Sequence, residues 1–412
     1  MANAFQNQVA YTNETLRILV NNIVLGKHVN RDFSKQFGKS TGKIGDTYNI
    51  RRPYKTLLNT GASFSATDYT ETSIPLVVNT QKHADVSFTS ADLTLKDEEY
   101  SDRIIKPSGI KLAQQIDIDG YVNAKNTVGN ASGTAGTAPN NVSFLTALGQ
   151  RMDDFSVPRD NRYLAIDQSG NASLINALSG FFNNQKQLGD QYTDGVFADN
   201  RATLGFMMAM SQNIARHTVG PLGGSPVING ASQGISSGWA NTTNVITNGW
   251  TASAANRLKA GDIVTFAGCF AVNPVTLQST GNLMQFVVTA DTSSDGSGNA
   301  TIPVSPAIIT GGPFQNVSAS PTNGGVVTVT GAASQAHSRS IAWDQDAFAL
   351  AVVPLEDLAQ FGGWGAVKSY DGFSVRVFRQ AAISTDTVGG RVDALYGWAT
   401  PYPEQACQFL GA

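Results

Sequence analysis

The stretch Tyr100–Asn126, YSDRIIKPSGIKLAQQIDIDGYVNAKN, carries the longest helical pattern in the chain. Leu112 and Ile116 lie four residues apart, as do Ile118 and Val122. These apolar positions spread over more than one face of a helix. The pattern therefore predicts a long helix that is covered on more than one side.

Two residues in this stretch oppose a helix. Pro107 removes a backbone hydrogen bond and predicts a kink, or a restart at Ser108. Gly120 costs about 1 kcal/mol relative to alanine. Asp102 is a predicted helix start, and Lys125 lies near the end, where the helix dipole favours a cation. Packing rather than propensity must stabilise such a helix, so we expect the other elements to be built on it.

The composition indicates a cytoplasmic protein of two or three domains with no cofactor and no metal. The chain has 412 residues, a charged fraction of 14% and a net charge of −3, so no basic field attracts nucleic acid. No signal peptide or membrane-spanning run is evident. The histidines and cysteines lie too far apart for metal-ligand spacing or a disulfide framework; they are His28, His83, His217, His337, Cys269 and Cys407.

An amphipathic helix is predicted at Thr12–Val24, with Thr12 or Asn13 as its cap. A short helix this close to the N-terminus needs a surface to lie on, either its own or that of a neighbouring chain. The residues of its apolar stripe are therefore candidate assembly residues: Leu16, Leu19, Val20 and Ile23, with Val24 after them.

A projecting loop is predicted after this helix. A strand near Thr47–Arg52 is followed by the polar stretch Tyr54–Asp68, and an extended run resumes at Ile74–Val78. Arg51 and Arg52 stand beside the loop, where they could pair with acidic groups of a neighbour or have an ordinary surface role.

The next part of the chain predicts an α/β layer packed on the long helix. A strand at Val86–Leu95 leads into that helix, and Asn141 or Ser143 then caps a helix that runs to about Phe155. A buried strand is expected at residues 163–166, a helix at 173–182 and an apolar run at 205–210.

A small all-β domain is predicted between Gly220 and Ala336, where charged residues become scarce. It is an insertion, because an α/β-like pattern resumes at Ile341, and strands follow at Phe373–Arg379 and Arg391–Trp398. The alternation of its three clearest strands predicts a core of Val264, Phe266, Phe286, Val288, Val327 and Val329, with Trp239 and Trp250 as further members.

Catalytic chemistry is not indicated. The sequence GKSTG at Gly38–Gly42 satisfies a nucleophile-elbow pattern, but its flanks are polar and a strand follows it, so a turn is expected. Asp117 with Asp119, and Asp153 with Asp154, could serve acid–base chemistry or bind a divalent cation. Adjacent carboxylates on a helix diverge, and we expect a solvated face or an intersubunit ion pair instead.

Four segments resemble the major coat proteins of short-tailed, double-stranded-DNA bacteriophages. They are VLGKHVNRDF with GDTYNIRRPY at Val24–Tyr54, the helix ending QQIDID, RLKAGDIVTFAG at Arg257–Gly268, and YDGFSVRVFR at Tyr370–Arg379. They span nearly the whole chain in the order of that family. The resemblance implies an α+β fold of the Hong Kong 97 (HK97) type that carries an inserted immunoglobulin-like, all-β domain.

The resemblance also implies a division of the chain into five parts. These are an N-terminal arm (1–45), a strand with an extended E-loop (46–80), a spine helix with peripheral and axial domains (81–219), the inserted domain (220–336), and a return to the axial and peripheral domains with the C-terminal strands (337–412).

A structural, non-enzymatic function follows: self-assembly into an icosahedral shell around packaged double-stranded DNA. The implied partners are copies of the chain in hexamers and pentamers, a separate scaffolding protein and a portal protein, with loose DNA contact and no membrane. The implied locations are the virion and, during assembly, the host bacterial cytoplasm. A fibre or adhesin built on the β insert is the alternative function.

Overall fold

The computed structural model describes residues 4–37, 45–58, 60–62, 71–89, 106–141, 143–178, 202–203, 205–358, 364–382, 384 and 387–412. The chain forms two compact units, each assembled from several separate stretches of sequence. The first comprises residues 1–50, 74–120 and 348–399, and the second comprises 51–73, 121–347 and 400–412. Helices and strands together give the α+β architecture predicted from the sequence.

The first unit is organised around a sheet in which β19 (Thr387–Ala399) is central. β19 pairs with β3 (Thr80–Thr89), β18 (Phe373–Ala382) and β16 (Ala349–Val353), and β17 (Trp364–Tyr370) pairs with β18. A separate two-stranded sheet joins β1 (Asp46–Arg51) to β2 (Ser73–Val78). Between those two strands, residues 52–58 and 60–62 form no helix or strand, and the projecting loop itself stays a prediction because residues 63–70 lie outside the described part of the chain.

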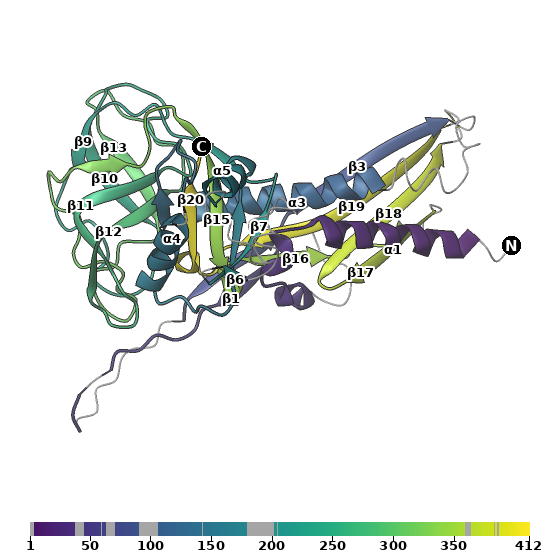
Figure 1. Cartoon of the computed structure of the whole chain (residues 1–412), viewed down its shortest axis with the longest axis horizontal. Helices are drawn as coiled ribbons and strands as arrows, with labels where there is room; N and C mark the ends of the chain where they lie inside the picture. The colour runs from purple at the N-terminus through teal and green to yellow at the C-terminus, as the bar shows by residue number, and fades with distance from the viewer. Residues whose placement is uncertain are drawn as a thin grey trace. The chain divides into compact units, whose positions relative to one another are not determined.

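The N-terminal helix α1 spans Ala4–Asn22, so it begins earlier than the sequence predicts. Thr12 is buried inside the helix and is not its cap. No glycine or proline interrupts residues 4–12, so nothing local ends the helix at the expected position. In Figure 1, α1 (purple) runs beside the yellow strands β17 and β18, with which it is in contact.

The predicted long helix is α3, Lys106–Thr127. Pro107 lies in its first turn, where a missing backbone N–H costs nothing, so no kink arises. The predicted start at Asp102 lies outside the described residues. Gly120 is required by packing, because a Cβ there would lie 2.6 Å from Cζ2 of Trp398 and 2.8 Å from Cδ2 of Leu25.

The second unit contains a mixed sheet with the strand order β4-β20-β15-β5-β7-β6, and β8 pairs with one part of β15. Helix α4 (Ser143–Asp154) packs on the sheet through Leu145, Leu148 and Met152; the backbone N–H at its start, that of Ser143, donates to Oδ1 of Asn141 at 3.0 Å, as the predicted cap requires. The other bounds are α5 (Gln168–Leu178), β4 (Ala131–Gly133), β5 (Arg162–Ile166), β6 (Ala202–Thr203), β7 (Phe206–Met210), β8 (Arg216–Thr218), β15 (Ala336–Asp344) and β20 (Ala406–Leu410).

Residues 224–329 form a six-stranded antiparallel sheet in the order β14-β11-β12-β13-β10-β9. Its two end strands meet through a bridge between Val227 and Val326, so the sheet closes into a barrel rather than forming the two facing sheets of an immunoglobulin sandwich. The strands are β9 (Gly224–Ile228), β10 (Thr243–Trp250), β11 (Ile263–Val272), β12 (Ser279–Val288), β13 (Ala300–Ser305) and β14 (Val327–Val329).

The core of the barrel contains most of the residues predicted for it. Val264, Phe266, Phe286, Val288 and Val327 are buried together with Trp250, and Val329 is a partly buried neighbour. Alternation along each strand identified them, because side chains one residue apart point to opposite faces. Trp239 is half-buried and is not among these core residues, so that prediction was wrong.

Replacing Gly120 by alanine should lower the free energy of unfolding by about 1–3 kcal/mol, because the new methyl group overlaps the indole of Trp398. Gly149 in α4 is a matched control, since its Cβ would meet one atom of Phe206 at 3.8 Å and otherwise open space. Gly149→Ala should stabilise the chain by up to about 1 kcal/mol. Urea unfolding measures both changes, and equal effects would contradict this account of α3.

We propose that the barrel also folds alone. A fragment of residues 220–336 should unfold cooperatively, because it contains its own core. Phe266→Ala should cost that fragment about 3–5 kcal/mol. Circular dichroism during thermal and urea unfolding tests both statements, and a random-coil amide spectrum for the unsubstituted fragment would refute them.

Candidate functional site

The candidate assembly residues of α1 lie mostly inside their own unit. Leu16, Leu19 and Ile23 are buried, and Val20 is half-buried. The helix contacts strands β17 and β18, so its apolar stripe has a partner in the same chain. Because this face is mostly covered by its own chain, it does not by itself require a neighbouring chain. An assembly role for these residues stays a prediction.

Arg51 and Arg52 have separate surroundings. Arg51 is exposed and pairs with Glu71 at 3.0 Å. Arg52 is largely covered: it forms an ion pair with Glu404, and its guanidinium lies 4.9 Å from the ring centre of Tyr402. Both arginines thus pair with acidic residues of their own chain, and their pairing with a neighbour stays a prediction.

The carboxylates of α3 anchor other elements of the first unit. Asp117 is fully buried and accepts the backbone N–H groups of Val24, Leu25 and Gly26 at 2.7, 3.3 and 3.0 Å. Burial raises the pKa of Asp117 to about 6, and the three N–H donors act in the opposite direction. Asp119 accepts the hydroxyl of Tyr396 at 2.6 Å. Neither the solvated face nor the intersubunit pair expected from the sequence describes Asp117.

The joint between the barrel and the rest of the second unit is built around Asp262. This residue directly precedes β11 and is fully buried. Its carboxylate lies 2.7 Å from Nε2 of His217 and accepts the backbone N–H groups of Gly220 at 3.1 Å and Lys259 at 2.8 Å. One carboxylate therefore connects β8, the segment at Gly220 where the chain enters the inserted barrel, and the turn before β11.

Arg339 completes the joint from β15. Its guanidinium donates to the carbonyl of Gly261 at 3.1 Å and to the side-chain oxygen of Gln408 at 3.1 Å. Gln408 in turn donates to the carbonyl of Val128 at 2.6 Å. Burial lowers the pKa of Arg339 to about 9, with Asp262 acting in the opposite direction. The buried cation thus lies beside the buried carboxylate, because Arg339 binds the carbonyl of the residue that directly precedes Asp262.

Two buried histidines face each other in this joint. His217 and His337 are paired across β8 and β15, and their ring centres lie 5.7 Å apart at a steep angle. Burial lowers the pKa of His217, while its hydrogen bond to Asp262 acts in the opposite direction. Burial, together with the nearby Arg339 and His217, lowers the pKa of His337 to about 4. Both rings are therefore neutral at neutral pH.

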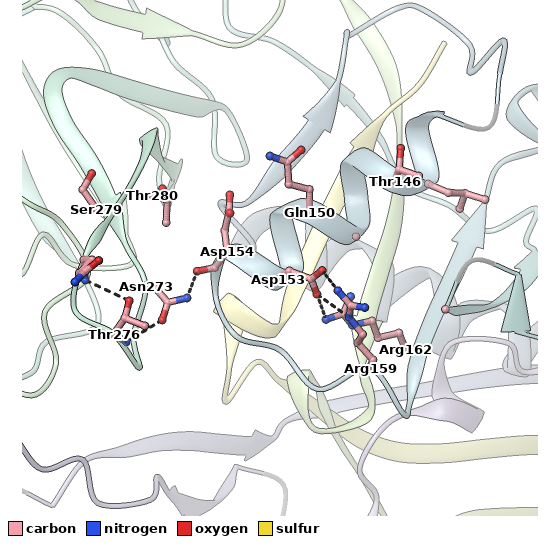
Figure 2. Close-up of a pocket in the computed structure, with 14 residues that line it drawn as sticks. Thr146, Gln150, Asp153, Asp154, Arg159, Arg162, Asn273, Thr276, Ser279 and Thr280 are labelled. Atoms are coloured by element: carbon pink, nitrogen blue, oxygen red, sulfur yellow. Dashed lines mark hydrogen bonds and ion pairs between the residues drawn. The ribbon is translucent and has the colours of Figure 1, made fainter.

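A second polar contact holds the barrel at the turn after β11. Asn273 donates to the backbone carbonyl of Asp154 at 3.0 Å and to Oγ of Ser156 at 2.9 Å, while its own oxygen accepts the N–H groups of Val275 and Thr276. Figure 2 shows Asn273 reaching from this turn to the end of α4. Hydrogen bonds therefore stabilise the turn and connect it to the end of α4.

Figure 2 also shows the pocket beside this contact, which has a volume of about 690 Å³. Asp153 in its wall pairs with Arg159 at 2.5 Å and with the buried Arg162 at 2.7 Å. Asp154 lies nearer the barrel and accepts from Asn282 at 3.2 Å. The two neighbouring carboxylates diverge as expected, and they stabilise structure within one chain.

Reactive chemistry is not evident in the described residues. Both cysteines are buried, and burial raises the pKa of Cys269 and of Cys407 to about 12, so neither thiol is nucleophilic. Among the described residues, no three His, Cys, Asp or Glu side chains lie close enough together to bind a metal ion. No helix in the described ranges has the length and apolar character to cross a bilayer. Gly38–Gly42 lies outside the described residues.

The joint is not predicted from the sequence. Asp262 is one of the few charged residues of the insert, and its partner His217 precedes it by 45 residues. The one available signal was the position of a lone carboxylate directly before a buried strand, since a charge there requires partners. Nothing in the sequence identified those partners.

Within each unit, buried side chains hold separate elements together, mainly through hydrogen bonds to the backbone, and this arrangement is suited to a structural subunit. The comparisons with known proteins agree with that class. The chain belongs to the family described as P22 coat protein, gene protein 5, whose sequence model matches residues 1–411. This membership and the α+β architecture confirm the HK97-type fold class that the sequence predicts.

Individual similarities are remote. The chain is 22% identical over 409 residues to the major capsid protein of Acyrthosiphon pisum secondary endosymbiont phage 1, and the match covers 95% of each protein. A solved structure from Mycobacterium phage Che8 is 13% identical, covers 95% of this chain and 92% of its own, and has a TM-score of 0.42. The CUS-3 coat protein I-domain is 22% identical, covers 27% of this chain and 92% of its own, and has a TM-score of 0.17.

Because His337 is buried in this joint, we expect the free energy of unfolding to fall in acid. A folded-state pKa of about 4 for His337, against 6.5 ordinarily, means that the folded chain favours the neutral ring. That contribution is present above pH 6.5 and is lost as the pH falls toward 4. Between pH 7 and pH 5 it should amount to about 2 kcal/mol.

The difference between the wild type and His337→Phe in urea unfolding at pH 7 and pH 5 measures this loss, because the raised pKa of Asp117 acts in the opposite sense over the same range in both proteins. His337→Phe removes the titrating ring and should give a smaller decrease than the wild type. His83→Gln, which alters a half-exposed side chain on β3, should keep the full decrease. An equal pH dependence in the wild type and the His337 variant would contradict the assignment.

Proposed function

We propose that this chain is the major subunit of an icosahedral phage capsid and that its role is structural and non-catalytic. The observation that carries the proposal is the family match over residues 1–411, which includes the arm, the spine helix and the inserted barrel. The ion pairs described above serve packing and joints, which supports a structural role. The match also extends on both sides of the barrel, which favours a shell subunit over an adhesin built on the barrel alone.

Copies of the chain itself, in hexamers and pentamers, are the proposed principal partners. The net charge of −3 supports only loose contact with packaged double-stranded DNA, because tight binding of phosphates requires clustered lysine and arginine. A scaffolding protein and a portal protein are proposed as further partners on the basis of the family. We place assembly in the host bacterial cytoplasm and the finished product in the virion.

The polar joints around Asp262 and Asn273 suggest what the barrel contributes. A shell requires subunits of uniform shape, and a flexibly tethered insert would not provide it. Buried hydrogen-bonded networks hold an element in one orientation, because every alternative leaves polar groups without partners. We infer that the joints keep the barrel in one orientation, so that it braces contacts between subunits.

The purified chain, together with a scaffolding protein, should form closed shells. Electron microscopy and light scattering measure this directly. A Phe266→Asp variant serves as a folding-defective control and should not assemble, because it places a charge in the barrel core. A monodisperse monomer or small ring of the wild-type chain under all such conditions would refute the proposal.

Mature particles should contain no covalent crosslinks between subunits. Lys55 lies at the base of the predicted loop, but the sequence around it, Tyr54-Lys55-Thr56, does not by itself indicate crosslinking chemistry. Particles boiled in detergent should therefore give one band near the chain mass of 43.5 kDa. A ladder of multiples of that mass would be the contrary result.

A further inference from the structure

A second pocket of the second unit, about 710 Å³ in volume, lies at the base of the loop. Its walls come from residues 52–58, the turn after α4, the turn after β11, Phe314 and the segment before β20. We call this pocket the loop-base groove. Most of its lining is apolar, and two of the side chains are unusually exposed: Leu58 is 96% exposed and Val275 is 75% exposed.

Two parts of the groove are held by polar contacts within the chain. Val275 belongs to the turn that Asn273 holds with both its oxygen and its nitrogen. Arg52, at the start of the segment that leads to Leu58, is held by Glu404 and Tyr402. Parts of the groove are thus formed in the single chain, and apolar groups on preformed surfaces are typical of interaction sites.

The electrostatics of the groove indicate what it binds. Three charged residues line it: Arg52, Lys55 and Glu404. Arg52 and Glu404 neutralise each other. Lys55 is half-buried and forms no ion pair with another described residue, and burial lowers its pKa, with Glu404 acting in the opposite direction. A second cavity of about 70 Å³ shares Lys55 and Phe314 with the groove. The groove therefore presents one uncompensated cation among apolar side chains.

We propose that a second copy of this chain binds in the loop-base groove and places an apolar side chain and a carboxylate there, with the carboxylate opposite Lys55. This inference rests on the proposed shell function, in which the neighbours of every subunit are copies of itself. Arg52 and Lys55 stand against the single carboxylate Glu404 in the groove, so its excess charge is positive and a carboxylate of an incoming copy complements it. Charge complementarity of this kind fixes the register of an interface.

Cysteine accessibility tests the apolar part of the proposal. Leu58→Cys and Val275→Cys each introduce one exposed thiol. The native Cys269 and Cys407 should not react with the label, because both are buried. Ile246→Cys is the control, because Ile246 is 48% exposed on the barrel and does not line the groove. Maleimide labelling rates are compared between the free chain and shells that have been emptied of scaffold.

Labelling at positions 58 and 275 should slow about tenfold or more in the shells, while position 246 keeps its rate. Unchanged rates at 58 and 275 in well-formed shells would overturn the groove and leave the shell function intact. Equal slowing at all three positions would also overturn the proposed binding in the groove, because the shell would then slow labelling everywhere and not at the groove in particular. Slowing of the free chain by scaffold alone, without shell formation, would identify a different occupant. If the wild-type chain forms no shells, both proposals fail.

Lys55→Met tests the charge, since it keeps the length and apolar stem of the side chain. Shell formation followed by light scattering should slow about tenfold. The matched control is Lys35→Met, which removes an exposed lysine 3.2 Å from Asp32 and outside the groove. Equal melting temperatures for both variants exclude a folding defect. Wild-type assembly kinetics for Lys55→Met would show that no carboxylate of a second copy lies opposite this residue.

Discussion

The close approach of α3 to β19 is the constraint on which the first unit depends. Gly120 leaves the space that Trp398 occupies, and the indole N–H of Trp398 donates to the carbonyl of Ile116 at 3.2 Å. With that face against the sheet, Asp117 reaches three backbone N–H groups that follow α1. Each of these N–H groups would otherwise be buried without a partner, at a cost of about 1–3 kcal/mol. One helix thus positions both the central strand and the N-terminal segment.

In the second unit, a different carboxylate likewise binds backbone N–H groups that would otherwise be buried without partners. An inserted barrel touches its host wherever the chain crosses, and Asp262 satisfies the backbone at one of those crossings. Its partner His217 and the nearby Arg339 belong to strands outside the barrel. A purely apolar joint would tolerate several orientations, because hydrophobic contact is not directional. Buried hydrogen bonds tolerate few, which suits a subunit that must fit identical neighbours.

These features explain why a coat protein has strongly perturbed titratable groups within its structural joints. The raised pKa of Asp117 and the lowered pKa of His337 both arise from burial within joints. Perturbed groups often mark catalysis, but structural networks perturb them by the same physics. Geometry separates the two cases here, because Asp117 faces three backbone N–H donors and the ring of His337 packs against that of His217.

The sequence by itself determined the elements whose signal is local. The spine helix and the barrel core around Phe266 and Phe286 follow from spacings of four and two residues, which depend only on backbone geometry. Long-range pairing was decided by the tertiary structure: Asp117 with Val24, 93 residues away, His217 with Asp262, and the closure of a single sheet into a barrel. A residue's own spacing carries no information about which distant donor will meet it, and only the packed chain places the two groups within hydrogen-bonding distance.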